Sequence, residues 1–302
     1  MSVSEDTDRE NSGVAALTAC AGVLYVVATP IGNLADLSTR ARAILATVDL
    51  IACEDTRHSR RLLAHFGIAT ALCAYHEHNE AEMTPRLLER LATGQALALI
   101  GDAGTPLISD PGFFLVRAAR ARGLPVSPIP GPCAPICALS AAGLPTDRFT
   151  FLGFVPRTAV QRRAWAESLR TVPGTLLCHD SGQRIVATLE ALAAALGPTR
   201  PAVIARELTK RFETFLHGSL AELAARIAAD PDQRRGELVL LVAGATTSAP
   251  EASDPEARRV LALLAAELPA HQAARLAAAI VGGRRNEWYR AALALRGTAS
   301  ED

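Results

Sequence analysis

Two short runs of titratable side chains in this chain have types and spacing that could carry chemistry. In His76-Glu77-His78 two imidazoles flank a carboxylate, and residues i and i+2 of a strand face the same side. Such a pair could bind a metal ion, act as a general base, contact phosphate or make structural hydrogen bonds. No third ligand stands at a suitable spacing. We therefore predict no metal site here.

The second run is Glu207-Leu-Thr-Lys210, in which an acid and a base are three residues apart. On a helical turn they would share a face and could pair. Lys210 is the only lysine, and the other 30 of the 31 basic side chains are arginine. A single lysine among so many arginines suggests that this position requires a compact, flexible ammonium group rather than a planar guanidinium. Two interpretations stay open: a desolvated cation beside a cleft, or a structural ion pair with Glu207.

A glycine- and proline-rich loop is the strongest indication of a binding site. Residues 101–112 (Gly-Asp-Ala-Gly-Thr-Pro-Leu-Ile-Ser-Asp-Pro-Gly) connect the apolar run 96–100, a predicted buried strand, to an amphipathic segment, 113–120. In an open α/β sheet, the loop leaving the carboxyl end of a strand borders the ligand site. An ordinary turn is the alternative. The loop matches neither G-x-G-x-x-G nor the lysine-bearing phosphate loop, which disfavours a dinucleotide or nucleoside triphosphate site.

The elements that must position these groups alternate between strands and helices. Strands are predicted at 23–28, 50–53, 71–74, 96–100 and 125–129, each followed by a helix, which indicates a parallel sheet in a domain over 21–142. After a hinge at 143–148, a second α/β domain over 149–245 has strands near 149–154, 175–179, 202–206 and 238–242 and helices near 162–169, 183–196 and 220–229. Its turns favour a mixed sheet. We expect residues 1–20 to be disordered.

The C-terminal residues 256–302 are predicted to be helical, after a linker at 246–255. Two helices, 272–281 and 286–295, would form a hairpin with several basic and aromatic side chains: Arg275, Arg284, Arg285, Trp288, Tyr289 and Arg290. Such a hairpin could contact nucleic acid, or it could only cap or dimerise the protein. Two further groups of arginines could bind phosphate or could simply be solvated on the surface. The first is Arg57, Arg60 and Arg61, and the second is Arg157, Arg162 and Arg163.

Composition limits the class of protein. The chain has 302 residues, 49% hydrophobic and 21% charged, with net charge +0. This is typical of a soluble globular protein with two domains, and it gives no global attraction to nucleic acid. Six cysteines without a C-x-x-C pair indicate neither zinc nor a disulfide framework. The acidic start is no signal peptide, and no apolar run reaches the roughly 18 residues of a membrane span. We expect a cytoplasmic protein without a membrane partner.

Six motifs in order carry a resemblance to a known family: Thr29-Pro-Ile-Gly-Asn-Leu34, Glu54-Asp-Thr-Arg57, Tyr75-His-Glu-His-Asn-Glu80, the loop 101–112, Pro130-Gly-Pro132 and Ala205-Arg-Glu-Leu-Thr-Lys210. The chain resembles the tetrapyrrole methylase-like superfamily and, within it, the methyltransferases of small-subunit ribosomal RNA. The resemblance covers about residues 23–244, with a weaker match at 270–296.

The resemblance implies two α/β domains of the tetrapyrrole methylase type with S-adenosylmethionine in the cleft between them. It also implies a homodimer that methylates the ribose 2′-hydroxyl of a cytidine in the decoding region of 16S rRNA, within the 30S subunit, with no DNA partner. Carried over by motif, the cofactor would lie against Pro30, Ile31, Gly101, Asp102, Thr105, Cys133 and Ala134. The second domain would close over it near 177–181 and Glu237.

The sequence departs from this family at two places. Cys133 stands where serine is common, which matters little if the backbone makes the contact. The run 179–184 (His-Asp-Ser-Gly-Gln-Arg) replaces the usual Tyr-Glu-Ser-Pro-His-Arg, so His179 would have to compensate for the missing tyrosine or histidine.

Methyl transfer to a ribose hydroxyl calls for alignment and for a base or an oriented cation. We select Glu54, His76, Glu207 and Lys210 as catalytic candidates from a wider set that also holds Asp55, Glu77, His78, Glu80 and Asp110. Two rival functions stay open: a tetrapyrrole methylase of the same fold, against which the arginine groups argue, and a non-catalytic ribosome-binding protein.

Overall fold

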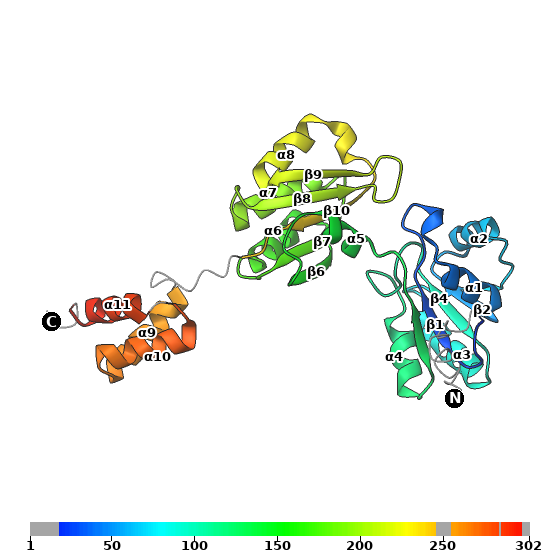
Figure 1. Cartoon of the computed structure of the whole chain (residues 1–302), viewed down its shortest axis with the longest axis horizontal. Coiled ribbons are helices and arrows are strands. Elements are labelled where there is room, and N and C mark those ends of the chain that lie inside the picture. The colour runs from blue at the N-terminus through cyan, green and yellow to red at the C-terminus, as the bar shows by residue number, and fades with distance from the viewer. Residues whose placement is uncertain (1–17, 246–254, 284, 298–302) are drawn as a thin grey trace, which may run out of the picture. The chain divides into compact units, whose positions relative to one another are not determined.

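The computed structural model describes residues 18–245, 255–283 and 285–297. The chain divides into two units, 1–244 and 245–302 (Figure 1). In the part of the chain that the structure describes, no helix has the length and apolar character needed to cross a membrane.

The first sheet is parallel throughout, as predicted. Its strands are β1 (Leu24–Val27), β2 (Leu50–Cys53), β3 (Leu72–Ala74), β4 (Leu97–Ile100) and β5 (Val126–Ile129), in the order β3-β2-β4-β1-β5. β1, β2 and β4 are almost entirely buried, because helices cover both faces of the sheet.

Alternation along these strands directs side chains to two separate cores. Val27, Ile51 and Ile100 pack with α1 (Thr39–Thr47) and α2 (Thr56–His65). Leu24, Leu50 and Leu99 pack with α3 (Glu80–Ala92) and α4 (Phe113–Ala121) on the other face. A short 3-10 helix, η1 (Leu34–Asp36), follows β1. The carboxyl ends of the strands therefore meet at one edge, where the loops that follow them gather.

The second sheet is mixed, which confirms the prediction from its turns. Its strands are β6 (Phe149–Phe154), β7 (Thr175–Ser181), β8 (Pro201–Arg206), β9 (Thr214–Ser219) and β10 (Glu237–Val242), in the order β6-β7-β10-β8-β9. β6 pairs parallel with β7, and the other pairs are antiparallel. Strand β9 was not predicted. Its sequence, Thr-Phe-Leu-His-Gly-Ser, is short and half polar, and it is only half buried at the sheet edge.

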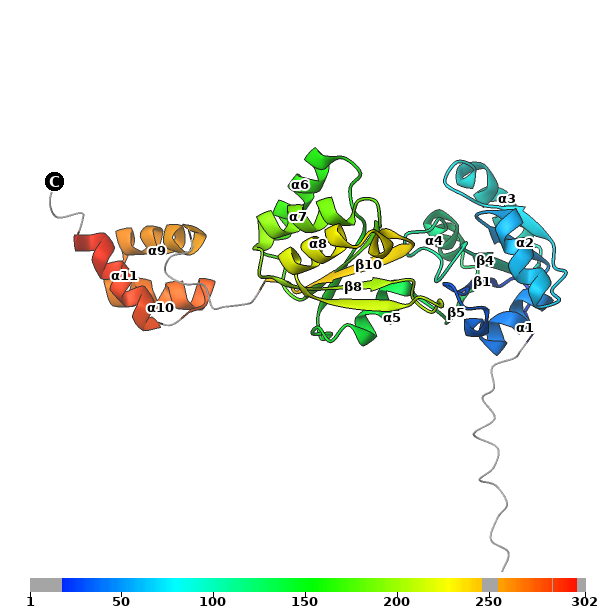
Figure 2. The same ribbon diagram turned by 90° about the horizontal axis from the view of Figure 1, so that it is seen from above.

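Helices cover both faces of the second sheet as well (Figure 2). α6 (Ala159–Ser168), α7 (Ile185–Leu196) and α8 (Leu220–Ala229) share a core with one face, and the 3-10 helix η2 (Pro231–Arg234) precedes β10. The other face packs on α5 (Ala134–Ala141), although α5 comes before the predicted hinge at 143–148. We keep 21–142 and 149–245 as proposed domains, with α5 packing across that division.

The C-terminal unit is a three-helix bundle rather than the predicted hairpin. α9 (Pro255–Glu267), α10 (Ala270–Val281) and α11 (Arg285–Gly297) all pack together. The sequence predicts residues 256–302 to be helical but specifies only two helices, so α9 is the one not specified. It begins at Pro255, the last residue of the predicted linker, and proline suits the first position of a helix. Trp288 is fully buried in the bundle and donates a 2.7 Å hydrogen bond to the Gly282 carbonyl, so it is not a surface contact. Of the residues predicted to be disordered (1–20) and of the predicted linker (246–255), 1–17 and 246–254 lie outside the described residues, as does Arg284.

Candidate functional site

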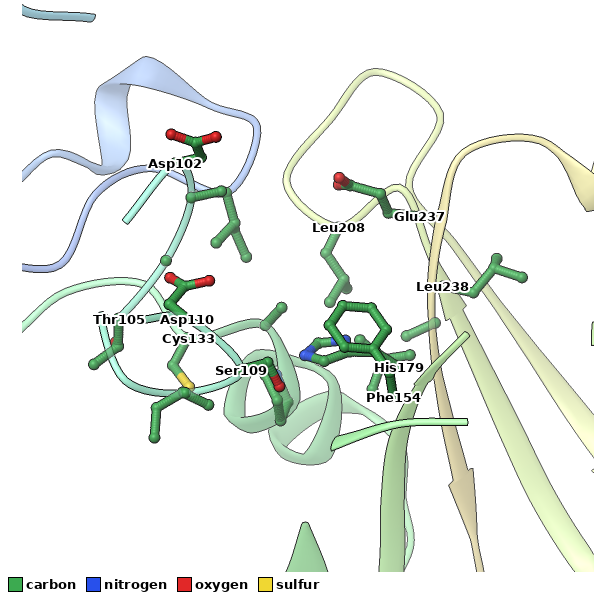
Figure 3. Close-up of a pocket in the computed structure, with 18 of the residues that line it drawn as sticks. Asp102, Thr105, Ser109, Asp110, Cys133, Phe154, His179, Leu208, Glu237 and Leu238 are labelled. Carbon is green, nitrogen blue, oxygen red and sulfur yellow. The ribbon is translucent and has the colours of Figure 1, made fainter. Parts of the chain in front are cut away.

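The site is a pocket of about 370 Å³ within residues 1–244, at the carboxyl ends of β2 and β4 and beside β7 and β10 (Figure 3). Its volume is within the range of small-molecule sites, roughly 300–1,000 Å³. The loop 101–112 forms one wall, and the second sheet forms the other. The lining residues are Ile31, Glu54, Asp102, Ala103, Gly104, Thr105, Ile108, Ser109, Asp110, Cys133, Ala134, Pro135, Phe154, His179, Asp180, Ala205, Leu208, Glu237, Leu238 and Val239.

The loop 101–112 is fixed to its neighbours rather than loose. Thr29 and Gly104 exchange backbone hydrogen bonds of 2.9 and 3.0 Å, and the Thr105 hydroxyl donates to the Pro132 carbonyl at 3.0 Å. Leu107 and Ser109 adopt positive φ angles of 72° and 68°, a conformation that costs free energy in a residue with a side chain. The loop therefore holds a strained shape beside the pocket.

Three carboxylates lie on this wall, and they differ in their partners. Asp102 accepts a 3.1 Å hydrogen bond from the Asp55 backbone N–H. Burial, followed by the charges of Asp102 and Glu77, raises the pKa of Glu54. Burial, together with the charges of Glu54 and Asp102, raises the pKa of Asp110 to about 7. The Asp110 Oδ2 atom is buried and has no hydrogen-bond partner among the described residues.

The opposite wall carries an aromatic pair that includes His179, the first residue of the run 179–184 in which the sequence departs from the family. The His179 ring lies 5.0 Å from the Phe154 ring and 5.4 Å from the Phe151 ring. Burial lowers the pKa of His179, which keeps this imidazole neutral near pH 7. The neighbouring Asp180 carboxylate is buried and pairs with Arg184, and it accepts a 2.6 Å hydrogen bond from the Thr188 hydroxyl. His179 thus lines the pocket, while Asp180 fixes the end of β7.

Lys210 joins two carboxylates near the rim of the pocket. Its Nζ atom lies 3.1 Å from Glu207 Oε1 and 2.8 Å from Glu237 Oε2. Glu207 and Lys210 pair, which is one of the two interpretations left open by the sequence. They do so on a turn rather than a helix, since Glu207 and Thr209 have positive φ angles of 50° and 65°. A Cβ atom on Gly32 would stand 2.5 Å from Lys210 Cγ, so only glycine leaves room for the lysine stem.

The ion pairs shift the titration of both partners. Burial by itself would raise the pKa of Glu207, but the Glu237 backbone N–H and the Lys210 ammonium outweigh it and lower that pKa. For Lys210, burial is likewise outweighed by the two carboxylates, and the pKa rises. This geometry fits the structural interpretation of the lone lysine. Its part in catalysis stays a prediction.

The predicted site residues separate into those that line the pocket and those beside it. The lining set is Glu54, Ile31, Asp102, Thr105, Cys133, Ala134 and Glu237. Pro30, Gly101, His76, Glu207 and Lys210 are outside the lining, although Pro30 and Gly101 directly precede lining residues and Lys210 contacts Glu237. His76 and His78 follow β3 in a turn, not on a strand, with their rings 5.9 Å apart. The described residues contain no group of three or more potential metal ligands.

The arginine groups are only partly available for contacts. Arg57, Arg60 and Arg61 are exposed, as phosphate contacts would require. Arg162 is buried and donates to the carbonyls of Pro156 and Arg157, so the second group is reduced to Arg157 and Arg163. In the C-terminal bundle Arg275, Arg285, Tyr289 and Arg290 are exposed.

Comparison with known proteins decides the family. A family profile described as "Tetrapyrrole (Corrin/Porphyrin) Methylases" matches residues 23–224, and one described as "RsmI C-terminal HTH domain" matches residues 251–296. Ribosomal RNA small subunit methyltransferase I of Xylella fastidiosa is 53% identical over 89% of this chain and 98% of that protein. The protein of the same name from Pseudomonas aeruginosa is 54% identical over 92% and 99%. The chain belongs to the ribosomal RNA small subunit methyltransferase I family.

The fold of this family member recurs in distant structures. Diphthine synthase superposes with a TM-score of 0.57 at 17% identity, covering 74% of this chain and 90% of that one. The likeness confirms the predicted tetrapyrrole methylase architecture, and the family membership confirms the resemblance inferred from the six motifs.

Sequence reasoning missed Phe154 and Leu208 as lining residues of this methyltransferase-family pocket. Phe154 stands at the end of a correctly predicted strand, and 63% of it is exposed, which is unusual for a phenylalanine. Its position at a strand end was the available signal. Leu208 lies between the positive-φ residues Glu207 and Thr209, in a turn whose shape the sequence leaves open.

Proposed function

We propose that the chain transfers the methyl group of S-adenosylmethionine to the ribose 2′-hydroxyl of a cytidine in the decoding region of 16S rRNA. The observation that carries this proposal is its similarity, about half of all positions over nine-tenths of its length, to proteins named for methylating small-subunit ribosomal RNA. The six sequence motifs support it as well, and four of them contribute residues to the pocket lining, among them Ile31, Glu54, Asp102 and Leu208.

The pocket has the chemistry to hold this cofactor. When bound, S-adenosylmethionine supplies an electrophilic methyl group on a sulfonium cation and also carries an ammonium and a carboxylate group. The carboxylates of Glu54 and Asp102 complement the two cationic groups. α5 begins at Ala134, after the N-cap Cys133, and no side chain caps it. Pro135 lacks an amide N–H, so the Ala134 N–H is the first helix amide that could face a carboxylate. We propose Ile31, Asp102, Thr105, Cys133, Ala134 and Glu237 as the residues that hold it, with Pro30 and Gly101 shaping the loops behind them.

The protein's own contribution is to bind and align the reactants and to exclude water. Holding a hydroxyl in line with a bound methyl group supplies several kcal/mol of rate acceleration by itself. The fixed loop 101–112 and the His179–Phe154 pair provide two firm walls for this purpose. We propose Glu54 as a charged group of the reacting site. We assign His76 and the Glu207–Lys210 pair to its supporting shell.

The RNA contacts are proposed for exposed cations in both units. Arg57, Arg60 and Arg61 follow β2 at the same sheet edge as the pocket. Arg275, Arg285 and Arg290 lie on the unit that matches the HTH profile. Arginine is well suited to phosphate because its planar group donates two parallel hydrogen bonds. We propose, from the family resemblance, that the substrate is the assembled 30S subunit, that the enzyme is a homodimer and that it is cytoplasmic.

The test is methyl transfer from labelled S-adenosylmethionine to 30S subunits and to free 16S rRNA that lack native methylation, with mass mapping of the product. A 2′-O-methylcytidine on the 30S particle alone is the expected result. Sedimentation of the purified protein tests the dimer. A bound cofactor without transfer to either RNA would favour a small-molecule methylase, and loss of cofactor binding would favour a non-catalytic ribosome-binding protein.

A further inference from the structure

Asp110 differs from the other carboxylates near the pocket because one of its oxygens is buried without a hydrogen-bond partner among the described residues. Asp102 accepts from a backbone N–H, Asp180 pairs with Arg184, and Glu207 and Glu237 share the Lys210 ammonium. Asp110 lines the pocket, yet its Oδ2 atom is buried without a hydrogen bond to any described residue. A buried carboxyl oxygen left unpaired costs free energy, so its retention needs an explanation.

The backbone around Asp110 forces the carboxylate into this position. Ser109 immediately before it and Leu107 hold positive φ angles, and Gly112 follows with φ 130°. A Cβ atom on Gly101 would stand 2.0 Å from Asp110 Oδ2, so the carboxylate lies directly against the Gly101 backbone. Strain that holds an unpaired group beside a pocket is typical of a site in which that group acts on a ligand.

We propose that Asp110 is the proton acceptor for the ribose 2′-hydroxyl during methyl transfer. This inference rests on the proposed function. The hydroxyl oxygen forms a bond to the methyl carbon while the carbon–sulfur bond breaks, and the hydroxyl proton passes to the Asp110 carboxylate. The sulfonium cation becomes a neutral thioether, the ribose hydroxyl becomes a methyl ether, and the Asp110 carboxylate becomes a neutral carboxylic acid. Atoms and charge therefore balance.

The surroundings of Asp110 suit this role. A base is most effective when its pKa lies near the working pH, and burial with Glu54 and Asp102 raises the pKa of Asp110 to about 7. The other titratable groups that line the pocket, besides Glu54 and Asp102, are Cys133, His179, Asp180 and Glu237. Asp102 accepts a backbone hydrogen bond, Asp180 is paired with Arg184 and Glu237 is paired with Lys210. Among the lining carboxylates this leaves Asp110 and Glu54 without a hydrogen bond or ion pair to a described residue. Glu54 then acts mainly as the charge that raises the pKa of Asp110.

The decisive variant is Asp110→Asn, which keeps the shape and removes the base. We expect the single-turnover rate on 30S subunits to fall at least 100-fold while the dissociation constant for S-adenosylmethionine, from calorimetry, changes less than threefold. The wild-type rate should rise with pH to a plateau above about 7, and the remaining rate of the variant should be independent of pH. Glu82→Gln, which removes an exposed carboxylate of α3 paired with Arg86, is the matched control and should keep the wild-type rate and profile.

A second measurement needs neither cofactor nor RNA. The infrared C=O band of a protonated carboxylic acid should disappear between pH 6 and 8 in the wild-type protein and be missing in Asp110→Asn. In Glu54→Gln the same band should disappear at lower pH, because one of the charges that disfavour ionisation is gone.

The outcomes separate the two proposals. If Asp110→Asn loses S-adenosylmethionine binding, Asp110 is a cofactor ligand and the inference is wrong. A wild-type rate in this variant also overturns it, as does a carboxyl band already absent at pH 5. If the wild-type enzyme methylates neither substrate, the proposed function fails, whereas the infrared titration still reports on Asp110.

Discussion

Two groups of carboxylates flank the same pocket, and they are held in opposite ways. On the 101–112 side, Glu54, Asp102 and Asp110 form no ion pair with any residue that the structure describes, and the pKa values of Glu54 and Asp110 rise. On the side of the second sheet, Glu207 and Glu237 share the chain's only lysine, and the pKa of Glu207 falls. A paired carboxylate is kept ionised and stabilises the fold, whereas an unpaired one is kept ready to take a proton at a cost in stability.

One carboxylate of each group packs against the backbone of a glycine. A glycine-to-alanine substitution on each side therefore tests whether the two groups have different roles. A Cβ atom on Gly101 would meet Asp110, and one on Gly236 would meet Glu207 Oε1 at 2.1 Å. The same substitution should therefore affect reaction on one side of the pocket and stability on the other.

Gly101→Ala should give the largest effect, a loss of about 100-fold in the methyl-transfer rate, because a shift of about 1 Å in a reacting group costs that much. The rate is measured by single turnover on 30S subunits. In the double variant with Asp110→Asn the two losses should not add, since both act through one carboxylate. Fully additive losses would show that Gly101 acts independently of Asp110.

Gly236→Ala should destabilise the protein by about 2 kcal/mol, because the new methyl group displaces Glu207 and the backbone has φ 86°. Denaturant titration measures the change. Gly94→Ala is the matched control, with φ 91° and open space around the new Cβ atom, and it should cost only the backbone part, about 1 kcal/mol. Equal costs in the two variants would mean that the contact with Glu207 carries no weight.

Asp110→Asn should stabilise the protein above neutral pH, on the order of 1 kcal/mol after allowance for the partial exposure of the side chain. The pKa of Asp110 rises from 3.8 to about 7 on folding, so the native state binds more protons between these values. The free energy of unfolding of the wild-type protein therefore decreases as pH rises through this window. In the variant, the part of this decrease that comes from Asp110 is absent. Thermal unfolding midpoints at pH 5 and pH 8 test it, and an equal pH response in both proteins would contradict the raised pKa.

Lys210→Met should have the smallest effect, a loss of roughly 0.5–1 kcal/mol at pH 7, because both ion pairs are partly exposed. Folding lowers the pKa of Glu207 below 4.5, so this contribution is present above that pH and is lost as the pH falls through the folded value. Lys210→Arg keeps the charge and should keep most of the stability. If Lys210→Arg loses methyl transfer while remaining folded, the lysine has a role beyond pairing.

The second sheet shows where sequence patterns suffice and where they do not. Strands such as Leu238–Val242 and Ala202–Arg206 are continuous apolar runs bounded by turns, so they were predicted within a residue or two. Strand β9 and the turn at 207–210 were not, because their shape depends on pairing with β8 and on ion pairs with Glu237, which is 27 residues beyond Lys210. The sequence also suggests Trp288 and Arg162 as surface contacts for nucleic acid. Both are buried, because neighbouring elements that are distant in the sequence pack over them.

The sequence by itself determined the family, the two kinds of sheet and the loop that borders the pocket, because these depend on local apolar periods and on motifs in order. Only the tertiary structure decided which charged groups meet. Asp110 and Glu54 are 56 positions apart, and whether a carboxylate finds a cation or another carboxylate depends on which strand ends lie side by side. That proximity sets the pKa values and separates a proposed base from a structural ion pair.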